Sequence, residues 1–499
     1  MSAERTDWRR PPYWLLPVFV VLMLAPPAWV VIALLGGSIA TILARAAAGV
    51  RHRRAAAARN GRDGVILGRG ANGEQLRVSD RQLSAHGLIL GASGAGKSTT
   101  LLTILADRIA RGLPVVAIDL KGSPTFAREL ATAAHAAGRP FAMWTPDGPA
   151  DWNPLRHGNA TELKDKLIGA ERFTEPHYQR AAERYVQTVL QVLEHSHPDR
   201  PPTLDEVVRL MDPRRVPALL RAVPQQLRER VQDYLAGLTP DQLSAIRGLG
   251  TRLAIISESH TGRYLSPPQP DQRQSIDLRR ALSGPEVVLF SLNSSTYGTL
   301  SAQLGTLVVQ DLIAASGDRL AQREARADAN AASHATIAID EFSALGADHV
   351  ISLLARARGA GVSVLLATQE LADLDRAARG LRDQVLGNTA IKIAHRQDVP
   401  SSAQTIAQMA GTQKTWDRTL PIGNPFLGGM QNGRGTRRLV EEFVIHPNQI
   451  KGLETGQAVV ISKLPSATAR TVRVSPPSRD ERSIRAGPPA RGQEGRELG

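Results

Sequence analysis

The sequence lacks cysteine altogether and is poor in aromatic residues. Because none of the 499 residues is a cysteine, disulfide bonds, thiolate zinc sites and cysteine nucleophiles are all excluded. Aromatic residues make up only 4% of the chain, which argues against an extensive surface for stacking nucleic-acid bases. The length allows two or three domains with a large buried core, so the chemistry has to be sought in other residue types.

Positive charge is concentrated at the two ends of the chain. Of a net charge of +14, residues 1–62 contribute nine arginines against two acidic residues, and residues 470–499 contribute seven against four. A basic surface on the body of the protein must therefore be local. The basic ends could lie against anionic lipid or nucleic acid, although a solvated charged end is the commoner explanation of such a run.

One long apolar run, residues 13–48, is interrupted only by small residues and Arg45. At about 1.5 Å per residue it is too long for one upright span of a ~30 Å membrane core and slightly short for two. A helical hairpin turning at Pro26 and Pro27 would place both arginine-rich flanks in the cytoplasm. A single kinked span and a cleaved signal peptide are the alternatives. We expect residues 1–62 to form a membrane anchor and basic linker, with the bulk of the chain cytoplasmic.

A glycine-rich loop follows a short apolar strand at residues 87–90 and precedes a helix that begins at Ser98. The spacing Gly91-x4-Gly96-Lys97-Ser98 is that of the phosphate loop of nucleotide-binding proteins. In such a loop the lysine reaches the β- and γ-phosphates of ATP, and the serine hydroxyl binds Mg²⁺. A glycine-rich turn with a chance Lys-Ser is the alternative, but strand, loop and helix occur in the required order. The predicted nucleotide-binding residues are Gly91, Ala92, Ser93, Gly94, Ala95, Gly96, Lys97, Ser98 and Thr99.

Strands and helices alternate on both sides of a purely helical stretch. Apolar strand patterns occur at residues 115–119, 286–291, 335–340, 362–367, 389–393 and, as the last strand, 457–461, with helices between them at 98–111, 124–135, 297–315 and 349–358. This alternation predicts an α/β domain with a mostly parallel sheet and helices on both faces.

The helical stretch has its own signals. Tyr178, Ala182 and Tyr185 open a stripe with a period of 3.6 residues, and capping-box patterns begin at Thr203 and Thr239. We see no convincing strand there. The predicted organisation is an anchor and linker (1–62), a first part of the α/β domain (63–160), an inserted all-α domain (161–283), a second part of the α/β domain (284–475) and a disordered tail (476–499). Within the second part of the α/β domain we expect an exposed loop at 318–334 and an irregular loop or hairpin at 411–438.

Paired acids end the strand at residues 335–340. Asp340 could bind Mg²⁺ with its water shell, and Glu341 could act as the base that orients the attacking water. Alone, four apolar residues before Asp-Glu are often only a strand end. Together with the phosphate loop, they predict ATP hydrolysis, with Ser98 and Asp340 holding the metal and Lys97 and Glu341 in catalytic roles.

Three further positions have less specific patterns. Gln369, which ends the next strand after Thr368, would place an amide near the γ-phosphate as a sensor, or could simply cap the strand. Arg356 and Arg358 are candidates for an arginine finger inserted into a neighbouring subunit's site, with Arg358 preferred, although a solvated helix face explains either. The segment from Asp119 to Gly122 could line the nucleotide or DNA-facing side, or form a tight turn.

Taken together, these motifs resemble the type IV secretion coupling proteins, the TraG/TraD-like conjugation ATPases. The resemblance covers residues 65–475 and the anchor, and its more specific part is Asp119-x-Lys-Gly with Asn153-Pro-Leu. It implies a RecA-like P-loop domain carrying an all-α domain, and hexamers with a central channel. It assigns Lys97 and Ser98 to nucleotide and Mg²⁺ binding, Asp340 and Glu341 to hydrolysis, and Gln369 to sensing. The anchor departs from the family's pattern because it leaves little room for an extracytoplasmic loop.

The first hypothesis is therefore an inner-membrane ATPase that moves DNA with little sequence readout and delivers it, with its bound relaxase, to a type IV secretion channel. The sequence leaves open whether that DNA is single- or double-stranded. A second reading keeps the motor and changes the cargo, as in an FtsK/HerA-like duplex pump or a protein-secretion ATPase. A third reading is a membrane receptor that recruits cargo and uses nucleotide only to assemble.

Overall fold

The computed structural model divides into two units, residues 1–63 and 64–499, and everything below concerns the second unit. The structure describes residues 64–171, 173, 175–266, 274–325, 334–419 and 436–477. The predicted membrane segment 13–48 and most of the predicted tail lie outside these residues. Within the described residues, no helix is both long enough and apolar enough to span a bilayer.

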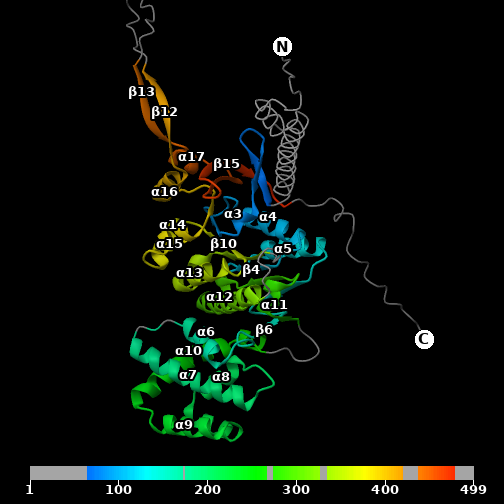
Figure 1. The fold of residues 1–499 in the computed structure, drawn as a ribbon, viewed down its shortest axis with the longest axis vertical. Helices are drawn as coiled ribbons and strands as arrows, with labels where there is room; N and C mark the ends of the chain where they lie inside the picture. Colours follow the sequence, from blue (N-terminus) through cyan, green and yellow to red (C-terminus); the bar gives the residue numbers. More distant parts are fainter. Residues whose placement is uncertain are drawn as a thin grey trace, which may run out of the picture. The chain divides into compact units, whose positions relative to one another are not determined.

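An eleven-stranded mixed sheet organises this unit (Figure 1). Its order is β2-β1-β15-β14-β11-β3-β10-β9-β4-β8-β5. Neighbours from β11 to β5 pair in parallel, and the four strands beyond β11 pair antiparallel. The parallel strands are β11 (Ile391–Ala394), β3 (Gly87–Leu90), β10 (Val362–Thr368), β9 (Ala335–Asp340), β4 (Val115–Asp119), β8 (Val287–Ser291) and β5 (Phe141–Trp144), and the others are β2 (Gln75–Val78), β1 (Val65–Gly70), β15 (Thr468–Val474) and β14 (Gln457–Ser462).

The central strands are buried on both faces, because successive residues of a strand point to opposite sides. Val115 and Ala117 of β4 join one core cluster with helix α4 (Lys97–Ala110) and helix α5 (Pro124–Ala136). Val116 and Ile118 join the other cluster, with α12 (Ser294–Ala325) and α13 (Ala347–Ala357). The predicted α/β class with helices on both faces is therefore correct.

Three details of the strand and helix prediction were wrong. Residues 457–461 are not the last strand, since β15 follows and pairs with both β14 and β1. β5, at the sheet edge, was not predicted at all. The predicted loop at 318–334 begins as helix, because α12 continues to Ala325 after a non-helical break at Gly298.

Helices fill the chain between β6 (Asp151–Trp152) and β7 (Ser275–Ile276), two short strands that pair in parallel. Thr203 and Thr239 cap two of these helices through the predicted capping boxes. The helices are α6 (Ala160–Gly169), α7 (Pro176–Ser196), α8 (Leu204–Leu210), α9 (Gln225–Ala236) and α10 (Pro240–Ser257), with 3₁₀ turns η1 (Pro213–Ala222) and η2 (His260–Tyr264) (Figure 1). The next helix, α11 (Leu278–Ser283), packs on α12 and on the sheet, although the predicted insertion extended to residue 283.

The helical region is joined to α12 by a buried polar contact. The Lys166 ammonium lies 2.7 Å from Asp311, whose other carboxylate oxygen accepts a 3.0 Å hydrogen bond from the Trp152 indole. Trp152 also packs edge-on against Trp144 and Phe290, with ring centroids 6.0 and 5.3 Å apart. A pair of charges this deeply buried is tolerated because each has hydrogen-bonding partners.

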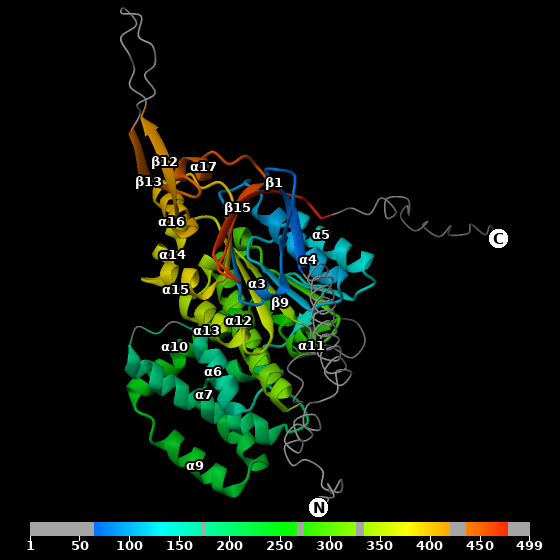
Figure 2. The same cartoon turned by 45° about the horizontal axis from the view of Figure 1, so that its top comes forward.

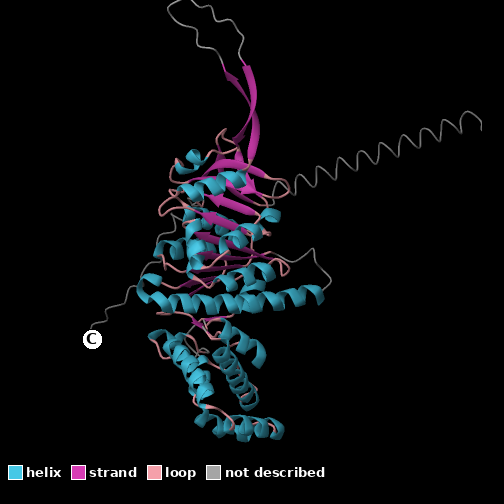
Figure 3. Cartoon of the chain, turned by 90° about the vertical axis from the view of Figure 1, so that its left-hand side faces the viewer, coloured by secondary structure: helices cyan, strands magenta, loops and turns pink. Residues whose placement is uncertain are grey.

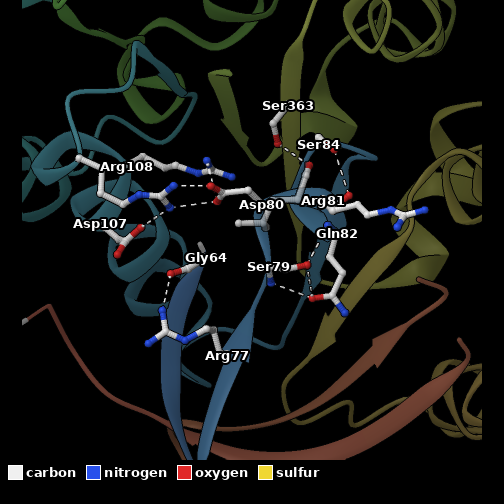
Figure 4. Close-up of polar contacts among 12 residues, drawn as sticks. Gly64, Arg77, Ser79, Asp80, Arg81, Gln82, Ser84, Asp107, Arg108 and Ser363 are labelled. Atoms are coloured by element: carbon white, nitrogen blue, oxygen red, sulfur yellow. Dashed lines mark hydrogen bonds and ion pairs between the residues drawn. The ribbon is translucent and has the colours of Figure 1, made fainter. Parts of the chain in front are cut away.

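The short helix α3 (Asp80–Leu83) ties the sheet edge to α4 (Figure 4). Ser79 caps α3 through a capping box with Gln82. Asp80 then lies between two arginines of the α4 end, at 3.0 Å from the fully buried Arg108 and in an ion pair with Arg111. The two guanidinium groups compensate this carboxylate where α3 meets α4.

The segment predicted as an irregular loop or hairpin contains a two-stranded ribbon, β12 (Thr412–Thr419) and β13 (Thr436–Phe443), and residues 420–435 between the strands lie outside the described residues. Figures 2 and 3 show the ribbon extending away from the main sheet, and Figure 2 shows α16 (Pro400–Ala410) and α17 (Pro447–Lys451) near its base. Trp416, 64% exposed, faces Leu439 across the ribbon.

Candidate nucleotide-binding site

Four strand ends bring the predicted site residues together at one edge of the sheet. The order of strands places β10 between β3, which leads into the phosphate loop, and β9, which ends in the paired acids. In register, Thr368 lies beside Leu90, and Asp340 lies between Ala367 and Asp119. Because ligands of open α/β sheets bind at the carboxyl ends of parallel strands, this edge is the candidate site.

The phosphate loop has the backbone that its glycines predict. Gly94 and Gly96 adopt positive φ values of 77° and 114°, which side chains other than glycine rarely adopt. Gly91 is needed for a different reason, since a Cβ there would come within 2.9 Å of His395. Three backbone hydrogen bonds fix the loop to its neighbours, from Gly91 to Thr368, from Ala92 to Arg396 and from Gly456 to Ala95.

The loop leaves donors for a ligand. α4 begins at Lys97, and its N-cap, Gly96, has no side chain to accept the first-turn N–H groups. Ser93, Gly94 and Ser98 are exposed. Free N–H groups at a helix N-terminus suit the phosphates of a nucleotide, so the loop fits the predicted ligand.

The loop lysine lies against both predicted acids. Lys97 Nζ is 2.6 Å from Glu341 Oε1 and 3.3 Å from Asp340 Oδ1, and Gln369 Nε2 donates to the same Oε1 at 3.1 Å. Glu341 has a left-handed backbone, with φ 58° and ψ 39°, which is uncommon for a residue other than glycine. Such a conformation is often kept at functional sites because it aims a side chain that the strand would otherwise point elsewhere.

Glu341 is held in its charged form. Burial raises its pKa, but hydrogen bonds and charges from Lys121 and Lys97 outweigh burial, so the pKa lies below its usual value. The pKa of Asp119, on the neighbouring strand, is instead raised by burial and by the charge of Asp340. Asp119 accepts backbone hydrogen bonds from Lys121 at 3.0 Å and Ser123 at 2.6 Å, so it shapes the turn after β4.

Two contributors to the site were not predicted. Lys121 Nζ lies 2.6 Å from Glu341 Oε1, whereas the sequence predicts its segment only as a lining of the nucleotide or DNA-facing side or as a tight turn. His395, fully buried at the end of β11, hydrogen-bonds Thr100 of α4 at 2.8 Å and the carbonyl of Gln457 at 2.8 Å. Burial lowers the pKa of His395 to about 4, so the imidazole stays neutral behind the phosphate loop. Its only sequence signal is its place directly after an apolar strand.

The predicted metal ligands also lie at this edge. Ser98 follows Lys97 in the first turn of α4, and Asp340, 4% exposed, is held by Lys97. Mg²⁺ usually takes one or two protein oxygens and completes its shell with water and phosphate oxygens. The donor set therefore fits Mg²⁺ bound together with a nucleotide. The described residues contain no cluster of three or more His, Asp or Glu side chains that could hold a metal by themselves.

The predicted arginine finger lies elsewhere. Arg358 is the C-cap of α13, four residues before β10 begins at Val362, and is exposed, as is Arg356. It is therefore at the amino edge of the sheet, whereas Lys97 and Glu341 are at the carboxyl edge. Across the seven residues of β10 this separates them by about 20 Å within one chain.

Comparisons with known proteins agree with this arrangement. Residues 334–455 match the family model described as the TraM recognition site of TraD and TraG, and residues 65–136 match the HerA-like helicase C-terminal family. The sequence matches no curated protein.

Solved structures share the fold. The bacterial conjugative coupling protein TrwB aligns over 81% of this chain and 87% of its own, at 14% identity and a TM-score of 0.58. Its complex with ADP and Mg²⁺ aligns over the same shares at 14% identity and a TM-score of 0.55. VirB4 of Thermoanaerobacter pseudethanolicus aligns over 84% of this chain and 98% of its own, at 12% identity and a TM-score of 0.50.

At these identities the structural likeness establishes the fold, a RecA-like α/β domain, and the family models add the sequence relationship. The TraD and TraG model covers β9 with its paired acids, β10 with Gln369, and the β12–β13 ribbon. The resemblance to type IV secretion coupling proteins of the TraG/TraD kind is thereby confirmed.

Proposed function

We propose that this protein is a membrane-anchored coupling protein that hydrolyses ATP and moves DNA, with its bound relaxase, toward a type IV secretion channel. The observation that carries the proposal is the contact of Lys97 with Asp340 and Glu341 at the carboxyl edge of a coupling-protein fold. The solved relative TrwB has been captured with ADP and Mg²⁺, which supports the same ligands here.

Each residue of the edge has a distinct task. The phosphate loop and the first turn of α4 bind the phosphates, and Lys97 leaves the acids to reach them. Ser98 and Asp340 hold the metal. Glu341 accepts the proton of the attacking water, and Gln369, in contact with Glu341, responds to the loss of the γ-phosphate. Bound Mg²⁺-ATP supplies the phosphoryl group whose transfer to water releases free energy.

The partners of the proposed motor follow from the family and from the motor's geometry. A homo-hexamer with a central channel would let each chain supply Arg358 to its neighbour and contact the DNA phosphates without reading bases. Residues 13–48 would anchor it in the inner membrane, with residues 64–499 in the cytoplasm. Flotation of the full chain with lipid vesicles, lost when residues 1–62 are deleted, would test the anchor.

The decisive measurement is ATP hydrolysis by the full chain in detergent, without nucleic acid, with single-stranded DNA and with duplex DNA. DNA should stimulate hydrolysis, and Lys97→Ala or Glu341→Gln should lower kcat at least about a hundredfold. Lys451→Ala, an exposed lysine at the end of α17, is the matched control and should keep the wild-type rate. Robust hydrolysis that no nucleic acid alters would contradict the proposal.

A second candidate is a duplex pump, which the match of residues 65–136 to the HerA-like family favours. It keeps the same ATP site and changes the cargo. Stimulation by duplex DNA alone, with no response to single strands, would support this candidate. If neither DNA changes the rate while hydrolysis persists, a protein cargo becomes the better explanation, and if Glu341→Gln leaves DNA transfer intact, the protein is a receptor and not a motor.

A further inference from the structure

A lysine outside the phosphate loop reaches the predicted catalytic glutamate. Lys121 comes two residues after β4 ends, and its Nζ lies 2.6 Å from Glu341 Oε1. The two side chains differ in exposure, since Lys121 is 43% exposed and Glu341 only 13%. A cation in contact with solvent is therefore paired to a nearly buried carboxylate.

The backbone beneath Lys121 is fixed. Asp119 accepts hydrogen bonds from the N–H groups of Lys121 and Ser123. Gly122 has φ 72°, and a Cβ there would come within 2.6 Å of the Asn293 Cα. The turn is therefore packed directly against the segment that follows β8. Because the turn cannot shift easily, the contact breaks by rotation of the Lys121 or the Glu341 side chain and not by movement of the turn.

Three donors contact Glu341 Oε1, more than the lone pairs of one oxygen can accept with good geometry. Lys97 and Lys121 both lie 2.6 Å from it, and Gln369 lies 3.1 Å from it. A carboxylate oxygen offers about two lone-pair sites, so three donors leave this oxygen no site for the proton of a water. In this arrangement Glu341 is positioned but cannot act as a base through Oε1.

Phosphate binding removes only one of these donors. Lys97 belongs to the phosphate loop and moves to the phosphates when a nucleotide binds. Lys121 does not belong to the loop, so it and Gln369 remain on Glu341. Building on the proposed ATPase function, we propose that Lys121 is a positioning residue that holds Glu341 in a resting position, and that this contact slows hydrolysis until it breaks.

The first test compares steady-state ATP hydrolysis by the full chain and its Lys121→Met and Lys121→Arg variants without DNA. Lys121→Met, which keeps the stem and removes the charge, should raise the DNA-independent kcat about three- to tenfold, the effect of weakening one charged contact. The KM for ATP should stay within about twofold, since Lys121 is not in the phosphate loop. Lys121→Arg, which keeps a cation, should restore the low rate. An unchanged kcat, or a fall like that of Glu341→Gln, would overturn the proposal.

The second test needs no nucleotide. In the nucleotide-free protein, Lys121→Met should lower the Tm by about 1–3 °C, and the same change in a Glu341→Gln background should lower it by less than half as much. This double-mutant cycle separates the two proposals. Coupling between the residues in a protein whose hydrolysis ignores DNA would contradict the proposed function and leave the contact standing, whereas independent effects of the two changes would overturn the role of Lys121.

Discussion

Two buried histidines, His86 and His395, are kept neutral by the fold, because burial lowers the pKa of each to about 4. His86 precedes β3, and its two ring nitrogens are both engaged: Nδ1 accepts from the Val364 N–H at 3.0 Å and Nε2 donates to the Leu354 carbonyl at 3.0 Å. A protonated ring could not accept from Val364, and burial lowers the pKa of His86 to about 4. The fold therefore depends on a neutral imidazole at this position.

Stability should fall as the pH drops from 6.5 to 4. In this window the unfolded chain binds a proton at His86 and the folded chain does not, so the free energy of unfolding decreases by up to about 1.4 kcal/mol per pH unit. Above pH 6.5 the contribution of His86 is fully present. Urea unfolding at a series of pH values measures the slope. His86→Gln should reduce the slope of the free energy of unfolding against pH and leave the contribution of His395. A slope equal to that of the wild type would contradict this role of His86.

The sequence predicted the roles of residues well where the role depends on neighbours along the chain. It predicted them poorly where the role depends on the order of strands in the sheet. Thr203 and Thr239 cap helices as predicted, since a cap involves only the next three residues. The contact of Lys121 with Glu341 could not be predicted in the same way. It exists because β4 lies beside β9, and this neighbourhood arises from crossovers that join distant parts of the chain.

At the scale of elements, the prediction failed where a strand is half exposed. β15 contains Arg470 and Arg473 at exposed or half-exposed positions, so it was not recognised as a strand. The central strands are fully buried and were all recognised by their apolar runs. Hydrophobic pattern therefore identified the parallel centre of the sheet and missed β15, which lies between β14 and β1.

Breaking the ion pair between Asp80 of α3 and Arg108 of α4 should lower the free energy of unfolding substantially. Asp80→Asn would leave the fully buried Arg108 without its carboxylate partner, and removing one member of a buried ion pair costs about 3–5 kcal/mol. Asp80 is one-fifth exposed and Arg111 remains partly solvated, so we expect the lower part of this range. Chemical unfolding of the variant measures the loss.

The same carboxylate gives a second observable. Burial raises the pKa of Asp80, but the hydrogen bond from Arg111 and the charge of Arg108 lower it by more than burial raises it. The folded pKa therefore lies below 3.8. The stabilisation is therefore present above pH 3.8 and is lost as the pH falls through the folded value. The difference between wild type and Asp80→Asn should shrink in that acid range, and a difference independent of pH would argue against the ion pair.

Removing the tryptophan at the junction between the sheet and the helical region should destabilise the protein far more than removing the tryptophan of the ribbon. Trp152→Ala removes a buried indole packed on Trp144 and Phe290 and leaves Asp311 Oδ2 without its indole donor, for an expected cost of about 3–5 kcal/mol. Trp416→Ala, on the exposed face of the ribbon, should change stability by less than about 0.5 kcal/mol. Thermal unfolding compares them, and equal effects would contradict the assigned burial.

For the whole molecule, the position of Arg358 makes a prediction about assembly. Arg358 lies at the opposite sheet edge from its own Lys97, so if it acts as an arginine finger, it serves the site of another subunit. Chains with Arg358→Ala and chains with Lys97→Ala should each be inactive, and mixing them should restore part of the ATPase activity, because some interfaces then pair an intact lysine with an intact arginine.

Arg356→Ala serves as the matched control, as an exposed arginine of the same helix. It should be active without mixing. If instead the Arg356 variant is inactive and is complemented by Lys97→Ala chains, the finger is Arg356. Absence of complementation by either arginine variant would show that neither residue crosses the interface.

The pairing of β1 with β15, the first and last strands of the main sheet along the chain, has a mechanical consequence. β1, which begins just after residue 64, pairs with β15 through Gly68 and Val474, and Ser475 donates to Leu67 and accepts from Thr103 of α4. A force applied along β1 would load the hydrogen bonds that join β1, β15, β14 and β11 in shear, side by side, up to β3, the strand of the phosphate loop. Ladders loaded in this direction share the force among many bonds. A load that enters at β1 would therefore be distributed over several strands before it reaches β3, the strand that leads into the predicted phosphate loop.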